Sequence, residues 1–312
     1  MDNLLKVKVS KLFYHNQLSK IEIADKLRIS RFKVAKILEE AVSEGIVNII
    51  INEPADSYMD LESALEEKFR IFRAAVVGTS PDYEETRKKI GKAAAEVFIE
   101  MLDNNDTIGI AWGNTIFEMI ETLKPVRDKK NLAVVQLTGG LNQVSMNINA
   151  MELTRRIANR LNCRSYPLYA PAIVDNEETK KILMSESNII KTIEMFKMIN
   201  IAIVGIGSVV PEPSTMLYKD GFINKKDFEE IINGEAVGDI NSYFYNKDGE
   251  KSEISLEKKV IGISLEQLKR VRYTIGVAGG KFKADAIHGA LKGKIVNIIV
   301  TDSETAKEVL NK

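Results

Sequence analysis

Two short helices joined by a tight turn are predicted between residues 19 and 44, near the start of the chain. Apolar residues fall on one face of each helix, at the three-to-four-residue spacing of a helix that buries one side. In the first helix they are Ile21, Ala24 and Leu27, and in the second they are Val34, Ile37, Leu38 and Ala41. Ser30 stands where its hydroxyl can cap the second helix. Further apolar residues within 4–18 predict another helix packed behind these two.

A β-type run at residues 46–51 follows Gly45, and it forms either a wing beside the helices or the link out of them. Residues 52–56 then combine a proline with polar residues and show no periodicity. Such a stretch is typical of a domain boundary. We therefore expect an N-terminal domain over residues 1–53 and a second domain over residues 57–312.

In the second domain, short apolar runs alternate with helical segments. The runs lie at residues 74–77, 107–111, 132–137, 165–168, 201–204, 274–278 and 295–300. Helical spacing lies at residues 84–103, 115–123, 149–161 and 178–196, with a final helix after the last run. Continuous β-branched runs separated by helices are typical of a parallel sheet covered on both faces. The expected fold is α/β: an N-terminal helix-turn-helix domain followed by a larger, doubly wound, mostly parallel effector domain.

The second of the two N-terminal helices begins with a basic segment. From Arg28 through Lys36 there are four basic residues and no acidic one. A helix-turn-helix unit places the start of its second helix in the DNA major groove, which suits these residues. The candidate DNA-binding residues are Lys20, Ser30, Arg31, Phe32, Lys33 and Lys36. The alternative is an ordinary helical hairpin with a solvated face.

Composition limits the class of protein. The formal net charge is zero over 312 residues, which argues against a protein built wholly around nucleic acid. Residues 1–50, however, hold nine Lys or Arg against six Asp or Glu, so the N-terminal part is basic. The single cysteine, Cys163, excludes an internal disulfide framework and indicates a reducing compartment. No stretch approaches the roughly 18 apolar residues that span a bilayer. We expect a cytoplasmic protein without a membrane partner.

Four glycine-rich loops follow predicted strands, at residues 111–115, 138–141, 205–208 and 278–283. In open α/β sheets, ligands bind at the carboxyl ends of the strands, and glycine lets backbone N–H groups approach an anion. Thr115 offers a hydroxyl and Lys283 a positive charge, which would suit a phosphate, and Asp239 offers a carboxylate for sugar hydroxyls. The alternative is that the glycines only make tight turns. No loop has a dinucleotide or P-loop motif, so a nucleotide is not specifically indicated.

These motifs, in this order, resemble the SorC/DeoR-type family of bacterial sugar-responsive transcriptional regulators over essentially the whole chain. The resemblance rests on IEIADKL, ISRFKVAKIL, GIAWGNT, VVQLTGG, APAIVDN, AVGDI and VAGGKFKADAIHGAL. Within that family, the chain most resembles the deoxyribonucleoside regulators. It implies a C-terminal domain similar to sugar-phosphate isomerases, a phosphorylated sugar as effector, operator DNA as partner, and a homo-oligomer, either a dimer or a tetramer.

The resemblance also implies ligand residues. Gly113, Asn114 and Thr115 would form a phosphate loop and Lys283 would pair with the phosphate. Thr138, Gly139 and Gly140 would line the sugar, and Asp239 would accept from a hydroxyl. Regulators that hold a sugar aldehyde as a Schiff base have a lysine where this chain has Thr138, and a threonine cannot form an imine, so we expect noncovalent binding. Phe32-Lys33 also replaces the more usual Pro-Thr, which bears on the operator sequence.

We therefore predict a transcriptional repressor, released by its ligand, rather than an enzyme. The alternative is a sugar-phosphate isomerase or deaminase with a DNA-binding extension, which would need a positioned general acid or base. His288 is the only histidine of the second domain, and it falls within a predicted helix, where we expect it to pack rather than to react. His15, His288 and Cys163 lack the spacing of metal ligands, so no metal or cofactor is expected.

Overall fold

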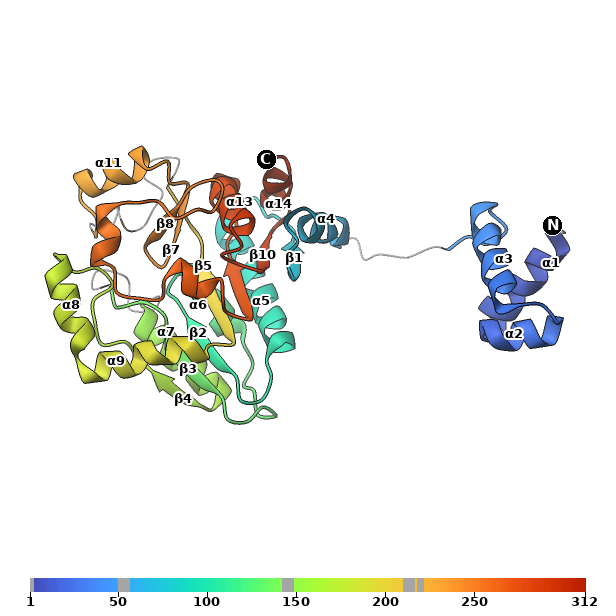
Figure 1. Cartoon of the computed structure of the whole chain (residues 1–312), viewed down its shortest axis with the longest axis horizontal. Coiled ribbons are helices and arrows are strands. Elements are labelled where there is room, and N and C mark those ends of the chain that lie inside the picture. The colour runs from blue at the N-terminus through green and yellow to red at the C-terminus, as the bar shows by residue number, and fades with distance from the viewer. Residues whose placement is uncertain (1–2, 50–56, 142–148, 210–216, 218–221) are drawn as a thin grey trace. The chain divides into compact units, whose positions relative to one another are not determined.

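The computed structural model describes residues 3–49, 57–141, 149–209, 217 and 222–312. Contacts divide the chain into two compact units, Met1–Ala55 and Asp56–Lys312. Figure 1 shows both units.

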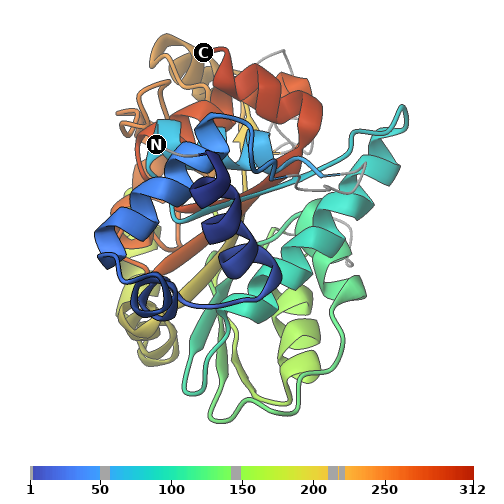
Figure 2. The same cartoon turned by 90° about the vertical axis from the view of Figure 1, so that its right-hand side faces the viewer.

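The N-terminal unit is a helix-turn-helix. Its elements are α1 (Asn3–Ser10), a π-helical turn (Lys11–His15), α2 (Lys20–Leu27) and α3 (Arg31–Ser43). Ser19 begins α2 with a reciprocal capping box to Glu22, and the Ser30 hydroxyl accepts from the backbone N–H of Lys33 at the start of α3. Val9, Ile23, Ala24, Val34, Ile37 and Leu38 form the core of this unit. Figure 2 shows its blue helices from a second direction.

Lys6 joins α1 to α3 from inside this unit. It is only 4% exposed, and its ammonium pairs with Glu40 at 3.1 Å and with Glu44. The hydrogen bond from the ammonium to Glu44 raises the pKa of Lys6. The lysine therefore stays charged at neutral pH and holds the first helix against the end of the third.

Two details of this unit differ from the sequence predictions. Ile21 is 59% exposed and Ile23 is buried in its place. Two residues correspond to about 200° of helix rotation, so Ile21 lies on the side of α2 opposite to Ile23, which belongs to the core. The second difference is in the predicted β-type run. Residues 46–49 form no strand, and the Val47 N–H bonds to the Ala41 carbonyl near the end of α3. Residues 50–51 of that run lie outside the described residues.

The second unit alternates strands and helices as predicted. Its main strands are β1 (Arg73–Val77), β2 (Thr107–Ile110), β3 (Ala133–Gln136), β4 (Arg164–Tyr166), β5 (Ile201–Gly205), β9 (Tyr273–Val277) and β10 (Ile298–Asp302). Its α-helices are α4 (Met59–Phe69), α5 (Tyr83–Met101), α6 (Asn114–Thr122), α7 (Ala150–Leu161), α8 (Glu177–Ser185), α9 (Ser187–Glu194), α11 (Lys225–Asn233), α12 (Leu265–Leu268), α13 (Ala284–Lys292) and α14 (Ser303–Leu310). The helix expected over 178–196 is two helices and a 3₁₀ turn, Met195–Met198, because the chain leaves helical geometry at Glu186.

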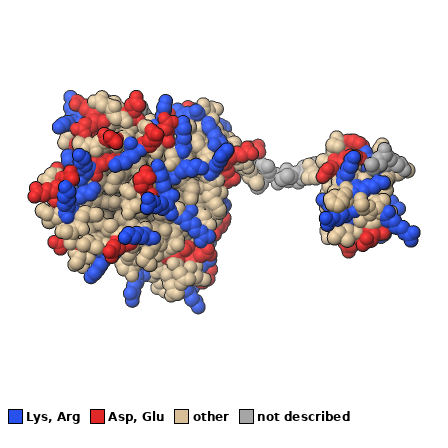
Figure 3. Space-filling model, viewed as in Figure 1, with Lys and Arg blue, Asp and Glu red and all other residues tan. Residues whose placement is uncertain are grey.

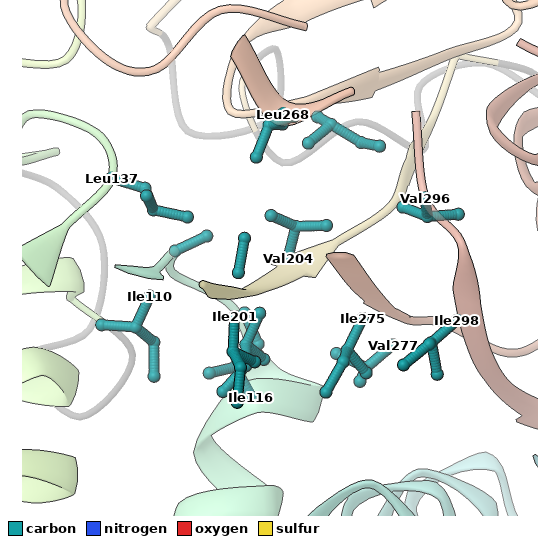
Figure 4. Close-up of a cluster of buried hydrophobic side chains, with 14 of the residues drawn as sticks. Ile110, Ile116, Leu137, Ile201, Val204, Leu268, Ile275, Val277, Val296 and Ile298 are labelled. Carbon is teal, nitrogen blue, oxygen red and sulfur yellow. The ribbon is translucent and has the colours of Figure 1, made fainter. Parts of the chain in front are cut away.

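The seven main strands form one parallel sheet in the order β1-β10-β9-β5-β2-β3-β4. Every residue of β2 and β10 is buried, so helices cover both faces of the sheet there. In Figure 4, Ile110, Ile201 and Ile275 point to the side where Ile116 of α6 lies, and Val204 points to the other side, toward Leu268. This α/β architecture confirms the predicted fold class.

Helix α4 covers the edge of the sheet that β1 forms. Glu66 Oε1 accepts from the backbone N–H of Ala74, and Glu62 Oε1 accepts from that of Val76, both at 2.8 Å. These two carboxylates satisfy N–H groups of edge strand β1 that would otherwise be open to another chain. Lys68 at the end of α4 donates to the Leu310 carbonyl, which ties the helix to α14.

A small antiparallel sheet stands beside the carboxyl ends of the main strands. It consists of β6 (Gly207–Ser208), β7 (Gly238–Ile240) and β8 (Tyr243–Tyr245). β6 pairs with β7 so that Gly207 lies opposite Asp239, and β7 pairs with β8 through a two-residue turn at Asn241 and Ser242. This hairpin brings the Asp239 carboxylate to the carboxyl ends of the main strands. No helix in the described ranges is long and apolar enough to cross a membrane.

Candidate ligand site

A cavity of about 210 Å³ opens at the carboxyl ends of β2, β5 and β9, three adjacent strands at the centre of the sheet. After β2 the chain continues to β3 on one side, and after β9 it continues to β10 on the other side. The loops therefore diverge at this point, which is where open α/β sheets bind their ligands. The β6–β7 hairpin supplies a further wall.

The start of α6 forms one side of the cavity. Gly113, Asn114 and Thr115 all line it, and Gly113 has a φ of 138°, a conformation that favours glycine. The first backbone hydrogen bond of the helix runs from Phe117 N–H to the Gly113 carbonyl at 3.0 Å. The N–H groups of the first turn have no partner within the helix, and the helix dipole adds positive potential there. This end of the cavity is suited to an anion.

Lys283 enters the same cavity from the loop after β9. Its ammonium donates to the Ile206 carbonyl at 2.8 Å, which fixes it against the cavity wall. Burial lowers the pKa of Lys283 from 10.5 to about 8, although the charge of Asp239 opposes this shift. The lysine is still mainly protonated at pH 7, and a bound anion would favour the protonated form.

Asp239 faces the cavity from β7 and is 7% exposed. Burial raises its pKa to about 6, while a hydrogen bond from the Ser242 N–H at 3.3 Å and the positive charge of Lys283 favour the ionised form. At pH 7 the carboxylate is mainly ionised and can accept hydrogen bonds from ligand hydroxyls. The cavity thus combines a positive side and an acceptor side.

The structure does not bring the other three predicted ligand residues to the described cavity wall. Thr138, Gly139 and Gly140 follow β3, and the N–H groups of the two glycines bond to the carbonyls of Ile261 and Ala170. The Thr138 hydroxyl is buried and has no hydrogen-bond partner among the described residues. Of the eight predicted ligand residues, five therefore share one cavity.

Several cavity residues were not among the sequence predictions. Tyr83 and Arg87 reach the cavity from the first turns of α5, and Trp112 and Asn241 line it from two loops. Tyr83 and Arg87 are distant in sequence from the glycine-rich loops, so no local motif marks them. Asn241 stands two residues after Asp239, in the turn that follows β7, where strand alternation does not predict the direction of its side chain.

The six predicted DNA-binding residues are all exposed on the N-terminal unit. Lys20 begins α2, and the other five lie at the start of α3 or just before it. Phe32 is 73% exposed, and the Arg31 guanidinium lies 5.0 Å from the centre of its ring. Figure 3 shows basic and acidic side chains interspersed over the visible face of the larger unit, so overall charge alone does not distinguish that face as a DNA-binding surface.

His288 lies in α13 and packs edge-to-face on Phe69, with ring centres 5.4 Å apart. Burial lowers its pKa. It is not among the residues that line the described cavity. This position fits the packing role expected from the sequence.

Comparisons with known proteins agree with the fold. Residues 53–311 match the family model described as "Putative sugar-binding domain". The chain is 32% identical over 308 residues to the deoxyribonucleoside regulator of Bacillus subtilis (strain 168), covering 98% of this chain and 97% of that protein. It is 29% identical to the sorbitol operon regulator of Klebsiella pneumoniae, covering 99% and 98% of the two chains.

Solved structures give the same result. The full-length sorbitol operon regulator SorC of Klebsiella pneumoniae superimposes with a TM-score of 0.78 at 28% identity, covering 99% of both chains. A DeoR family transcriptional regulator from Listeria monocytogenes superimposes with a TM-score of 0.73 at 31% identity, covering 80% of this chain and 98% of that one. Sequence and structure together show that the chain belongs to the sugar-binding domain family of SorC/DeoR-type transcriptional regulators.

Proposed function

We propose that this protein is a DNA-binding transcriptional repressor controlled by noncovalent binding of a phosphorylated sugar to its C-terminal unit. The observation that carries the proposal is a single cavity that combines a helix N-terminus, Lys283 and Asp239. The relatives are named as regulators of deoxyribonucleosides and of a sorbitol operon, which supports a sugar-related effector. In this role the protein works in the cytoplasm as a homo-oligomer, either a dimer or a tetramer.

The phosphate would lie between the start of α6 and Lys283. Backbone N–H groups at Gly113, Asn114 and Thr115 would donate to its oxygens, and the Lys283 ammonium would neutralise part of its charge. Thr115 is 8% exposed, so its hydroxyl would act in a site largely removed from water. Charge-assisted hydrogen bonds of this kind are stronger than neutral ones.

The sugar would extend toward Asp239, whose carboxylate accepts from hydroxyl groups. Thr138, Gly139 and Gly140 do not line the described cavity, and the N–H groups of the two glycines are engaged elsewhere. A threonine offers no amine for an imine, which supports a noncovalent complex at that position. The proposed ligand set therefore rests on Asp239, Lys283 and the first residues of α6.

DNA recognition is proposed for the start of α3. Arg31, Phe32, Lys33 and Lys36 are exposed on one capped helix, with Lys20 at the start of α2. The Ser30 hydroxyl accepts from Lys33 N–H and keeps its own proton for a phosphate oxygen. Sugar binding would alter the relative disposition of subunits and so reduce the fit of two such helices to successive major-groove faces.

We place the chain among regulators rather than enzymes. The names of its relatives favour this assignment. Turnover of a sugar phosphate by the purified protein would contradict it.

A thermal-shift screen of the full chain tests the ligand class. Pentose and hexose phosphates would each be compared with the matching free sugar, since a ligand that binds only the native state raises the unfolding midpoint by mass action. We expect at least one phosphorylated sugar to raise the midpoint of the larger unit, and its free sugar to do so far less. A screen in which no phosphorylated sugar shifts the midpoint would overturn the proposal.

A further inference from the structure

The side-chain amide nitrogen of Asn241 is buried and has no hydrogen-bond partner among the described residues. The residue lines the cavity and is 5% exposed, and its Nδ2 forms no hydrogen bond to any residue that the structure describes. Leaving such a group unpaired destabilises the folded protein. An acceptor atom on a ligand in the cavity would remove that destabilisation.

The β7–β8 hairpin fixes where this amide lies. Asp239 and Asn241 both line the cavity, while Ile240 between them lies in the core. Asn241 and Ser242 have φ angles of 55° and 65°, and Ile240 pairs with Tyr243 across them. A two-residue turn with both angles positive is the favoured connection in a hairpin, and it holds the Asn241 backbone in place.

The Asp239 carboxylate is held in the same turn. The Ser242 N–H donates to its Oδ2 at 3.3 Å. Gly207 lies opposite, and its missing side chain leaves room for the carboxylate. An acceptor and a donor therefore stand two residues apart on the same cavity wall.

We propose that Asn241 and Asp239 together recognise one hydroxyl group of the bound sugar, an inference that rests on the proposed function. The hydroxyl oxygen accepts from the Asn241 Nδ2, and the hydroxyl proton is donated to the Asp239 carboxylate. A hydroxyl can donate and accept at once, whereas the hydrogen of a deoxy position can do neither. The pair therefore selects a phosphorylated sugar with a hydroxyl at that carbon, and Asn241 is a specificity-determining residue.

Two variants of Asn241 test this role. Asn241→Gly removes the amide and tolerates the positive φ, which Ala would not. Asn241→Asp keeps the shape and replaces the donor by an acceptor. Asn105→Gly is the matched control, because Asn105 also has a positive φ of 68° but is exposed in the turn before β2.

Isothermal titration of the full chain would use the tightest-binding member of a panel of pentose 5-phosphates and hexose 6-phosphates. Inorganic phosphate, measured by displacement of that sugar phosphate, is the second probe. Both Asn241 variants should bind the sugar phosphate about tenfold more weakly, as expected for one lost hydrogen bond in a buried site. Asn241→Gly and Asn105→Gly should bind inorganic phosphate as the native chain does, and Asn105→Gly should also keep full affinity for the sugar phosphate.

Unchanged sugar-phosphate affinity in both Asn241 variants would overturn the inference and leave the proposed function standing. Equal losses for the sugar phosphate and for inorganic phosphate in Asn241→Gly would also overturn it, because the effect would then lie at the phosphate. A native chain that binds no member of the panel would contradict the proposed function itself, and the inference with it.

Discussion

Gly207 lies directly opposite Asp239 in the antiparallel pairing of β6 and β7, and a methyl group on Gly207 would collide with the Asp239 Oδ1. The carboxylate occupies the space that a side chain would need. Glycine at this position therefore leaves the Asp239 carboxylate in its place in the site. The position of Asp239 therefore depends on Gly207, which has no side chain.

Gly207→Ala should displace the Asp239 carboxylate. The clash is with the end of the Asp239 side chain, so the carboxylate can turn away and lose its hydrogen bond from the Ser242 N–H. We expect a loss of about 1 kcal/mol in the free energy of unfolding, together with weaker sugar-phosphate binding. Chemical denaturation and titration calorimetry would measure the two effects. Gly205→Ala is the control for stability, because its added methyl would meet only the Trp112 carbonyl at an ordinary 3.5 Å. Equal stability of the two variants would contradict this packing argument.

The ligand affinity should depend on pH through Lys283. Because its pKa in the empty cavity is about 8, the ammonium loses its proton as the pH rises from 7 to 9. A phosphorylated ligand prefers the charged form, so its affinity should fall by up to about tenfold over this range. Titration calorimetry at pH 7 and pH 9 would measure the change.

Lys283→Ala should weaken phosphorylated ligands far more than free sugars and should remove the fall in affinity above pH 8. It should also remove the contribution of Lys283 to the pH dependence of stability in the ligand-free protein. Between pH 8 and 10.5 the unfolded chain retains a proton that the folded chain has released, so Lys283 makes stability rise with pH there. Equal losses for phosphorylated and free sugars would mean that Lys283 does not hold the phosphate.

The edge of the sheet gives a test of the fold that is independent of the ligand. Glu66→Ala should leave the Ala74 N–H without its partner and lower the free energy of unfolding by about 1 kcal/mol. Glu67→Ala, at the exposed neighbouring position of α4, should have little effect. Thermal unfolding of both variants would decide whether the α4 carboxylates stabilise strand β1.

The start of α3 should carry operator binding. Replacing Arg31 or Lys33 by Ala should weaken operator affinity by about 1–3 kcal/mol or more, and should leave the ligand-induced thermal shift unchanged. Lys8→Ala is the control, since Lys8 is exposed on α1 and outside the predicted DNA surface. An Arg31 or Lys33 variant with native operator affinity would contradict the assignment of α3 as the recognition helix.

Much of the fold could be predicted because buried parallel strands read as continuous apolar runs. Where a strand begins was harder to predict. The run at residues 295–300 is apolar except for Asn297, and β10 begins only after it, at Ile298. The Asn297 side chain accepts from the Thr274 N–H and donates to the Arg272 carbonyl, which sets the register there. Ile295 and Val296 are buried without being part of the strand. Burial, and not strand pairing, is what the apolar pattern records.

The same limit applies to the glycine-rich loops. Gly113 and Gly207 line the cavity, whereas Gly139 has another cause: a side chain there would collide with the backbone of Ala170 and Pro171. A sequence shows that a glycine is present but not which neighbour demands it. Tyr83 and Arg87 were missed for the converse reason, since they reach the cavity only through the packing of α5 against the sheet.

The central claim is that one phosphorylated sugar controls DNA binding. Fragments of genomic DNA selected by the full chain would provide a labelled operator, whose fluorescence anisotropy would be followed with and without each sugar phosphate. We predict that at least one sugar phosphate weakens operator binding by about 5–150-fold, a coupling of ~1–3 kcal/mol, and that Lys283→Ala abolishes this effect. An operator affinity that no sugar phosphate changes would contradict the account.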